Sequence, residues 1–379
     1  MDKINLLIIV ASVSIFISVL LAIFLFTVKT KNRVSNVLFA VFLIINAIDI
    51  SDPLFNMVSD GPSNLEIFKN MLVFLQIPVF YLYVLSVCYS DFKLKPQYLL
   101  HAFPFLIANL ALLPHFYGVD TTSKIHFIEN RQNMIELKFN HILLHVQMVI
   151  YFVAVFRVLR KSKTLYLENY AGKNISSYHW LFQLTVVLCM VYAIALLKNI
   201  LKFSDYVYIS EEIKAGLLLL SLFIICWYLF KALNHPELFR NVDSKLKLVS
   251  EMVSEEKNSE DPVTSDRAYN EDLLKLKNYM VEKKPFLNSS LTIQEVSDEI
   301  GIPVRELSLL INHQLGQHFY DFVNTYRIEN AMNMLKDETK SKVTILEILY
   351  EVGFNSKSSF NTAFKKHTGT TPTLYRKSL

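Results

Sequence analysis

Long apolar runs are the feature that most restricts the fold of this chain. Residues 4–28 contain no charged side chain, and this run exceeds the roughly 20 residues that a helix needs to cross a hydrocarbon core of about 30 Å. With 52% hydrophobic and only 19% charged residues, the balance is unusual for a soluble protein. Six further apolar runs follow, at 34–52, 70–90, 97–117, 140–159, 177–203 and 213–233. The sequence therefore predicts an all-α chain whose first part, 1–233, is a bundle of seven membrane spans.

The first apolar run has two other interpretations. A buried helix of a soluble domain would seldom run so long without a charge, and a cleaved signal peptide has a shorter apolar core. No Ala-x-Ala-like cleavage site follows residues 4–28, and further apolar runs come after them. A membrane span is therefore the favoured interpretation.

The charges between the runs predict an orientation, because Lys and Arg concentrate in cytoplasmic loops. With the N-terminus outside, the inner loops carry Lys29, Lys31, Arg33, Lys93, Lys95, Arg157, Arg160, Lys161, Lys163 and Lys173. The outer loops are mixed or acidic, with Asp52, Asp60, Asp120, Glu129, Arg131, Glu136, Asp205, Glu211 and Glu212. Seven spans then bring the C-terminus into the cytoplasm. We expect a multi-pass protein of the cell (inner) membrane, in contact with membrane lipid.

Sequence motifs for catalysis, cofactors and metals are absent. There is no His-Glu-x-x-His, no Gly-x-Ser-x-Gly and no phosphate-binding glycine loop, and the chain has only 8 glycines. Cys88, Cys189 and Cys226 all fall inside predicted spans, without metal-ligand spacing and without a partner in an outer loop. We expect no enzyme activity, no cofactor and no metal site.

A polar segment follows the last apolar run. Residues 234–269 are rich in Glu, Lys, Ser and Asp and show little apolar periodicity, so we expect a flexible or partly helical linker. A short amphipathic helix near 243–256 is an alternative for part of it. A helical period returns from Tyr269, where a third region, 270–379, begins.

One short pattern occurs twice in this third region. Thr292 with Glu295, and later Thr344 with Glu347, match the capping box that fixes the start of a helix. A glycine that suits a left-handed turn follows each box, at Gly301 and at Gly353. The pattern predicts two helix-turn-helix units, at about 292–314 and 344–368. A connecting helix is expected between them, with apolar residues at Phe319, Phe322, Val323, Tyr326, Ile328, Ala331, Met334 and Leu335.

The charge of this region is balanced overall but uneven. From 285 to 379 the cations and the acids are equal in number, whereas no acid follows Gly353. Five cations do follow it, namely Lys357, Lys365, Lys366, Arg376 and Lys377. A local basic face on the second unit fits contact with phosphates.

These residues resemble the DNA-binding domain of the AraC/XylS family of bacterial transcription regulators. The matching residues are Tyr326-Arg327-Ile328, Ile345, Ile348, Glu351-Val-Gly-Phe354, Asn355-Ser-Lys-Ser-Ser-Phe360, Phe364-Lys-Lys366, Gly369, Thr371-Pro372 and Tyr375-Arg376. The resemblance covers roughly 270 to 379. The architecture is similar to membrane-anchored regulators of that family, in which a seven-helix sensor takes the place of a soluble sugar-binding domain. It implies double-stranded DNA and RNA polymerase as partners, and we also expect a homodimer.

The resemblance also assigns roles to residues. It implies that the groove-facing, base-reading side chains are Arg305, Glu306, Ser308 and Leu309 in the first unit, and Lys357, Ser358, Ser359, Asn361 and Thr362 in the second. Lys365, Lys366 and His367 are expected to meet phosphates, which position the protein without reading sequence. Two positions depart from the family pattern. Many members have Arg where Leu309 stands, and the usual residue at Leu349 is Ala.

Ionisable residues inside the apolar runs are candidates for sensing a signal. Asp49 and Lys198 lie at similar predicted depth and are expected to form a pair, or else to be solvated separately near the interface. His141 and His145 are one turn apart, and His115 ends a run on the same side. They predict a proton or metal sensor, or else ordinary interfacial histidines. The outer loop 118–139 is too short for a domain, so the unknown ligand or partner protein would bind among the helix ends.

The sequence leaves alternatives for the function and for the signalling. The favoured interpretation is that the protein is a membrane-anchored, sequence-specific DNA-binding regulator that couples an unknown signal to transcription. The alternative is a seven-helix receptor or transporter whose C-terminal helices bind a protein partner. A tethered regulator can act in place or be released by proteolysis, and action in place is favoured because tethering raises the local concentration of neighbouring output domains.

Overall fold

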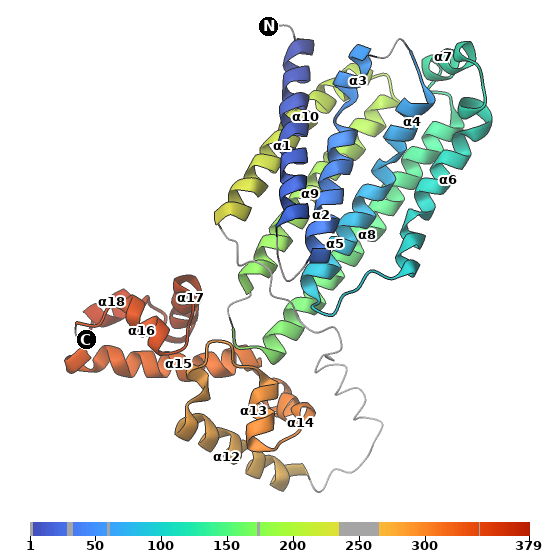
Figure 1. Cartoon of the computed structure of the whole chain (residues 1–379). Coiled ribbons are helices and arrows are strands. Elements are labelled where there is room, and N and C mark those ends of the chain that lie inside the picture. Colours follow the sequence, from blue (N-terminus) through green and yellow to red (C-terminus); the bar gives the residue numbers. More distant parts are fainter. Residues whose placement is uncertain (1–2, 29–32, 59–60, 173–174, 235–264, 341) are drawn as a thin grey trace. The chain divides into compact units, whose positions relative to one another are not determined.

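A computed structural model of the chain describes residues 3–28, 33–58, 61–172, 175–234, 265–340 and 342–379. The described residues form helices and turns and no strand, apart from one isolated bridge between Tyr170 and Thr292. The chain divides into two compact units. The apolar unit comprises Met1–Leu159 and His179–Asn241, and the C-terminal unit comprises Arg160–Tyr178 and Val242–Leu379. Figure 1 shows the helices of both units.

Most helices of the apolar unit follow the predicted runs, whereas α7 lies within the outer loop predicted at 118–139. They are α1 (Lys3–Thr27), α2 (Arg33–Asp49), α3 (Asp52–Val58), α4 (Asn64–Met71), α5 (Val73–Cys88), η1 (Pro96–Ala102), α6 (Phe103–Leu112), η2 (Leu113–Tyr117), α7 (Thr121–Glu129), α8 (Ile135–Asn169, whose last turns are in the C-terminal unit), α9 (Ile175–Lys202) and α10 (Val207–Asn234). Six helices in the described residues are long and apolar enough to cross a membrane, and a bent pair makes seven if it counts as one span.

The bent pair lies where a span was predicted at 34–52. Here α2 ends at Asp49, and α3 starts at Asp52 at an angle of 49°. Pro53 has no backbone N–H, so it cannot donate to the carbonyl one turn earlier. The continuous helical hydrogen bonding therefore ends ahead of this proline.

Aromatic side chains pack inside the apolar unit. Phe39 of α2 stacks on Tyr228 of α10, with ring centroids 4.3 Å apart, and lies 4.8 Å from the ring of Tyr83 of α5. Such pairs add to the stabilisation that burial of the rings already gives. They join helices from the beginning, middle and end of the unit.

The helices of the C-terminal unit include two similar pairs. They are α12 (Ser265–Lys283), η3 (Pro285–Leu287), α13 (Ile293–Ile300), α14 (Val304–Ser308), η4 (Leu309–Gln314), α15 (Phe319–Lys336), η5 (Glu338–Lys340), α16 (Ile345–Glu351), α17 (Lys357–Thr368) and α18 (Pro372–Lys377). We call α13 with α14 and η4 the first helix pair, and α16 with α17 the second. Residues 235–264, most of the predicted linker with its alternative helix 243–256, lie outside the described residues.

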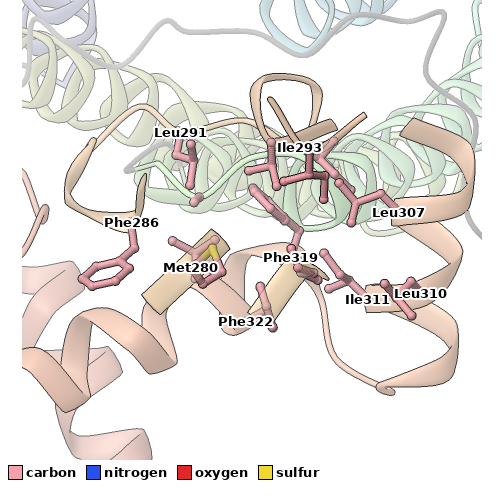
Figure 2. Close-up of a cluster of buried hydrophobic side chains, with 14 of the residues drawn as sticks. Met280, Phe286, Leu291, Ile293, Leu307, Leu310, Ile311, Phe319 and Phe322 are labelled. Carbon is pink, nitrogen blue, oxygen red and sulfur yellow. The ribbon is translucent and has the colours of Figure 1, made fainter. Parts of the chain in front are cut away.

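The long helix α15 connects two hydrophobic cores. Its first half contributes Phe319, Phe322 and Val323 to a core around the first helix pair, which Figure 2 shows in close-up. Its second half contributes side chains to a core around the second pair, namely Ile328, Ala331, Met334 and Leu335. Because each fully buried phenylalanine contributes about 1.5–3 kcal/mol, α15 is held firmly at both ends and acts as the scaffold of the unit.

Candidate nucleic-acid interface

Both helix pairs begin with the predicted capping box. The hydroxyl of Thr292 accepts from the N–H of Glu295 at 3.2 Å, and the Glu295 carboxylate accepts from the N–H of Thr292 at 2.9 Å. Thr344 and Glu347 make the same two bonds at 3.1 and 2.7 Å. Each box satisfies two backbone donors that the first helical turn leaves free. The hydrogen bond from the Thr344 N–H also holds the pKa of Glu347 below its usual value.

The two turns have positive φ at the predicted glycines. Gly301 ends α13 at φ 67°, and Gly353 follows α16 at φ 91°. Gly353 is constrained twice, because a Cβ there would lie 2.8 Å from the carbonyl oxygen of Leu287 and even closer to that of Phe286. The second turn therefore packs directly against η3, whereas a Cβ at Gly301 would have open space around it.

The second helix of the first pair is partly covered. Leu307, Leu310 and Ile311 face the first core, so the positions between them face outward. Among the predicted base-reading residues, Arg305 and Glu306 are exposed. Ser308 and Leu309 are only 2% and 9% exposed, and neither belongs to the first core. The structure therefore places only half of this predicted set on the surface.

Asn312, one turn after Ser308, was not among the predicted residues. Its amide donates to the side chain of Ser308 at 3.0 Å and to the carbonyl of Glu168 at 3.3 Å. Its side-chain oxygen accepts from the N–H of Phe319 at 3.0 Å. A spacing of four residues from Ser308 is the sequence signal that would have placed it on the same face.

The second helix of the second pair presents a polar surface. Phe360 and Phe364 point into the second core. The predicted base-reading residues Lys357, Ser358 and Thr362 are exposed, and Ser359 and Asn361 are half-buried. Ser356 caps the start of this helix, and its hydroxyl accepts from the N–H of Ser359 at 3.1 Å. This surface brings the predicted set together on one short helix.

The predicted phosphate contacts are on the last turn of α17. Lys365, Lys366 and His367 are exposed there. Lys366 forms an ion pair with Asp321 of α15 at 2.7 Å, so part of its charge is already compensated. A cavity of about 380 Å³ lies beside this pair, between the helix pairs, with Asn312 and His367 in its lining.

Among the described residues of the unit, Arg327 of α15 is the most buried charged residue, at 1% exposure. Its guanidinium donates to the carbonyls of Phe286 at 2.7 Å, Asn288 at 2.8 Å and Ala171 at 2.7 Å. Burial lowers its pKa to about 10, so it stays charged at neutral pH. It lies 5.5 Å from the centre of the Phe354 ring. In the sequence, Arg327 stands four residues after Val323, on the buried face of the helix. This spacing is the signal that could have predicted its burial.

The candidate sensing pair of the apolar unit lies near a group of close ion pairs. Asp49 and Lys198 interact electrostatically. The ion pairs at this end of the unit instead involve Asp52, which lies 2.6 Å from Lys69 and 3.1 Å from Lys214. From the sequence, Asp52 was expected in an outer loop, and neither lysine was predicted to pair with it, although Asp52 is only three positions after Asp49.

The three histidines have separate neighbours. His115 pairs with Glu136 at 2.6 Å, and His145 contacts the amide of Asn199 at 3.1 Å. The ring of His141 lies edge-on to Phe203, with centroids 5.1 Å apart. Within the described parts of the chain, no three metal-ligating side chains gather into a metal site.

Comparisons with known proteins concern the C-terminal unit. A family model described as a helix-turn-helix domain matches residues 296–378. A Staphylococcus aureus (strain COL) protein, named an uncharacterized HTH-type transcriptional regulator, is 37% identical over 89 residues, which are 24% of this chain and 12% of that protein. The uncharacterized transcriptional regulatory protein YesN of Bacillus subtilis (strain 168) is 35% identical over 104 residues, covering 23% of this chain and 28% of its own length. No solved structure matches.

The matched part is therefore a small share of these relatives. Within it, the helix-turn-helix match and the named regulators support a DNA-binding transcription regulator. The match includes α14, α15 and both helices of the second pair.

Proposed function

We propose that the chain is a membrane-anchored transcription regulator of the AraC/XylS type that binds double-stranded DNA sequence-specifically. Both helix pairs act as reading units, and their second helices enter successive major-groove segments about 34 Å apart. The observation that carries the proposal is the exposed polar surface of α17, which follows a tight glycine turn and ends in a cluster of cations.

The residues of α17 divide into two roles. Lys357, Ser358 and Thr362 are exposed near its beginning and middle, and together with Ser359 and Asn361 they contact base edges in the groove. Lys365, Lys366 and His367 follow at its end and contact phosphates. Arg305 and Glu306 supply the exposed base contacts of the first pair. Ser308 and Leu309 are buried in this structure and contact bases only in a state that exposes them.

Footprinting with the full chain in lipid nanodiscs tests DNA binding on the DNA that flanks its own coding sequence. Lys365→Ala should weaken binding to every sequence by a similar factor and flatten the salt dependence, whereas Asn361→Ala should change the preference at one or two base pairs. Absence of any protected site at low salt would count for the alternative, in which the C-terminal helices bind a protein.

The membrane part of the proposal rests on apolar side chains that face outward. Large hydrophobic residues are exposed along several long helices, including Phe16, Leu20, Ile142, Ile150 and Phe223. Exposed hydrophobic side chains in such number are costly in water and suit lipid. Together with the length of the six helices, they support insertion in the cell membrane. The loop charges support the orientation, with the N-terminus outside and the C-terminal unit in the cytoplasm.

Topology reporters test this orientation. A periplasmic alkaline-phosphatase fusion within 118–139 should be active, and a cytoplasmic reporter fused after Leu233 should be active too. A phosphatase fusion that is inactive within 118–139 would overturn the seven-span arrangement.

The signal enters, on this proposal, through the ionisable residues of the apolar unit. Asp49, Lys198 and the three histidines lie in or beside apolar helices, where charged groups are costly and mark functional sites. Lys198→Met and His145→Gln should each alter the response to the signal in a reporter strain and leave DNA affinity in nanodiscs unchanged. An unchanged response in both variants would remove these residues from the sensing site.

The remaining partners are a second copy of the chain and RNA polymerase. Dimerisation in the membrane doubles the DNA contacts of a C-terminal region without net charge, and action in place needs no cleavage. Immunoblots of induced cells should therefore show only the full-length chain on DNA. A soluble fragment of about the C-terminal third, appearing on induction, would favour release instead.

A further inference from the structure

The connection between α8 and α9 is part of the C-terminal unit. Residues 166–172, here called the α8 tail, include the last turn of α8 and the residues that follow it. Ala171 is only 1% exposed and belongs to the first core. Its N–H donates to the carbonyl of Leu291 at 3.0 Å, and its own carbonyl accepts from Arg327 at 2.7 Å. Both backbone groups of one residue thus anchor the tail.

The contact extends to the neighbours of Ala171. Tyr170 pairs with Thr292, the residue that caps α13, in an isolated antiparallel bridge. A Cβ on Gly172 would lie 3.4 Å from the carbonyl oxygen of Ser289, so the two backbones run close together. The tail therefore lies along the segment that leads into the first helix pair.

The other end of the tail touches the outward face of the first reading helix. The carbonyl of Glu168 accepts from Asn312 at 3.3 Å, and Asn312 also holds the side chain of Ser308. Ser308 and Leu309 are covered on this same face, although they do not belong to the first core. The major groove is about 12 Å wide, which leaves room for one helix only. A helix can therefore enter the groove only when no other segment is bound to its outward face.

From these contacts we propose that the α8 tail is an autoinhibitory element that covers the first reading helix. This inference rests on the proposed function and adds its regulation. With the tail docked, only the second helix pair is free to bind DNA. With the tail released, Ser308, Leu309 and Asn312 are exposed, and both pairs bind the full site.

The tail is well suited to pass on a signal, because α8 is one unbroken helix from Ile135 to Asn169. A rotation or shift of the apolar part of this helix moves its last turn as well. The docked state competes with DNA for one surface, so a signal that favours the released state raises affinity by mass action.

A removable cross-link tests the proposal in the full chain. Gly172→Cys and Ser289→Cys are introduced together after Cys88, Cys189 and Cys226 are replaced by serine, and a short bis-thiosulfonate reagent joins them in nanodiscs. Footprinting and affinity for the flanking DNA are measured before and after reductant removes the link. Each single-cysteine variant, treated in the same way, is the control.

With DNA in excess, which displaces the unlinked tail by competing for the same surface, the reduced protein should protect two major-groove segments, whereas the linked protein should protect one. Losing one of two joined reading units should weaken binding by about 100-fold. Equal affinity and equal footprints before and after reduction would overturn the autoinhibition and leave DNA binding intact. Absence of a sequence-specific footprint in both states would overturn the proposed function and the inference with it.

An accessibility measurement gives a readout that does not depend on DNA. In the same cysteine-free background, Leu309→Cys should react with a maleimide slowly, and Thr362→Cys on the open α17 should react at least about tenfold faster. Ala171→Pro removes the N–H that donates to Leu291 and should bring the rate at position 309 close to that at 362. A fast reaction at position 309 with the tail intact would contradict the proposal.

Discussion

The two helix pairs begin with the same capping box and turn on a glycine with positive φ, yet their second helices present different surfaces. In the first pair, Ser308 and Leu309 are covered, and the α8 tail contacts the helix. In the second pair, α17 exposes Lys357, Ser358 and Thr362. Local sequence signals therefore define two similar helix pairs, whereas contacts with the rest of the chain determine how much of each second helix is exposed.

The largest expected difference between the two helix pairs is the loss of stability when each turn glycine is replaced by alanine. Gly301→Ala introduces only left-handed backbone strain, about 1–2 kcal/mol. Gly353→Ala adds the clash with the carbonyls of Phe286 and Leu287, and overpacking costs a further 1–3 kcal/mol or so. Hydrogen exchange on the full chain should therefore show greater loss of amide protection in α16 for the second variant than in α13 for the first. Equal losses would remove the difference between the turns.

The next largest difference is expected between two neighbouring lysines of α17, in their contributions to DNA affinity. Lys365→Ala should lower DNA affinity by about tenfold at low salt and reduce the salt slope by about one. Lys366→Ala should have a smaller effect, because Lys366 already shares its charge with Asp321. Titrations at several salt concentrations measure both. A larger effect of the Lys366 change would mean that the ion pair opens on DNA.

The two caps should contribute similar amounts to local stability. Replacing either Thr292 or Thr344 by alanine removes the hydroxyl acceptor of its box and should cost about 1 kcal/mol. Hydrogen exchange at the first turn of α13 or of α16 is the measurement, and serine at the same position is the control because it keeps the acceptor. A serine variant whose amides exchange as fast as those of the alanine variant would argue against the capping role.

The smallest expected effect is a pH dependence of the second cap. The hydrogen bond from Thr344 lowers the pKa of Glu347 in the folded chain, so this contribution to stability is present above the ordinary glutamate pKa. It is lost as pH falls through the lowered value. Amides at the start of α16 should therefore exchange faster, after correction for intrinsic rates, as the protein is acidified. Glu347→Gln keeps a capping side chain without titration and should show no such change.

Features set by neighbouring residues were predictable from the sequence. The capping boxes, the turn glycines and the apolar face of α15 depend on residues a few positions apart, and each is present at the predicted place. The break before Pro53 was also local, although the apolar composition of 34–52 suggested one continuous span.

Features set by distant residues were not predictable. The contact of Asn312 with Glu168 joins residues more than a hundred positions apart, and no sequence pattern near Asn312 indicates it. Asp52 was likewise assigned to a loop, because its partners Lys69 and Lys214 come from other helices. The roles of the base-reading and sensing residues stay predictions.

Site-specific cross-linking from α17 tests most directly that this helix is an open reading surface. A photoreactive p-benzoylphenylalanine at position 362, in the full chain in nanodiscs, should form an adduct with one or two adjacent bases of the footprinted site and none with a scrambled sequence. The same group at position 309 should give little adduct while the α8 tail is docked. Adducts from position 309 and none from position 362 would contradict the account.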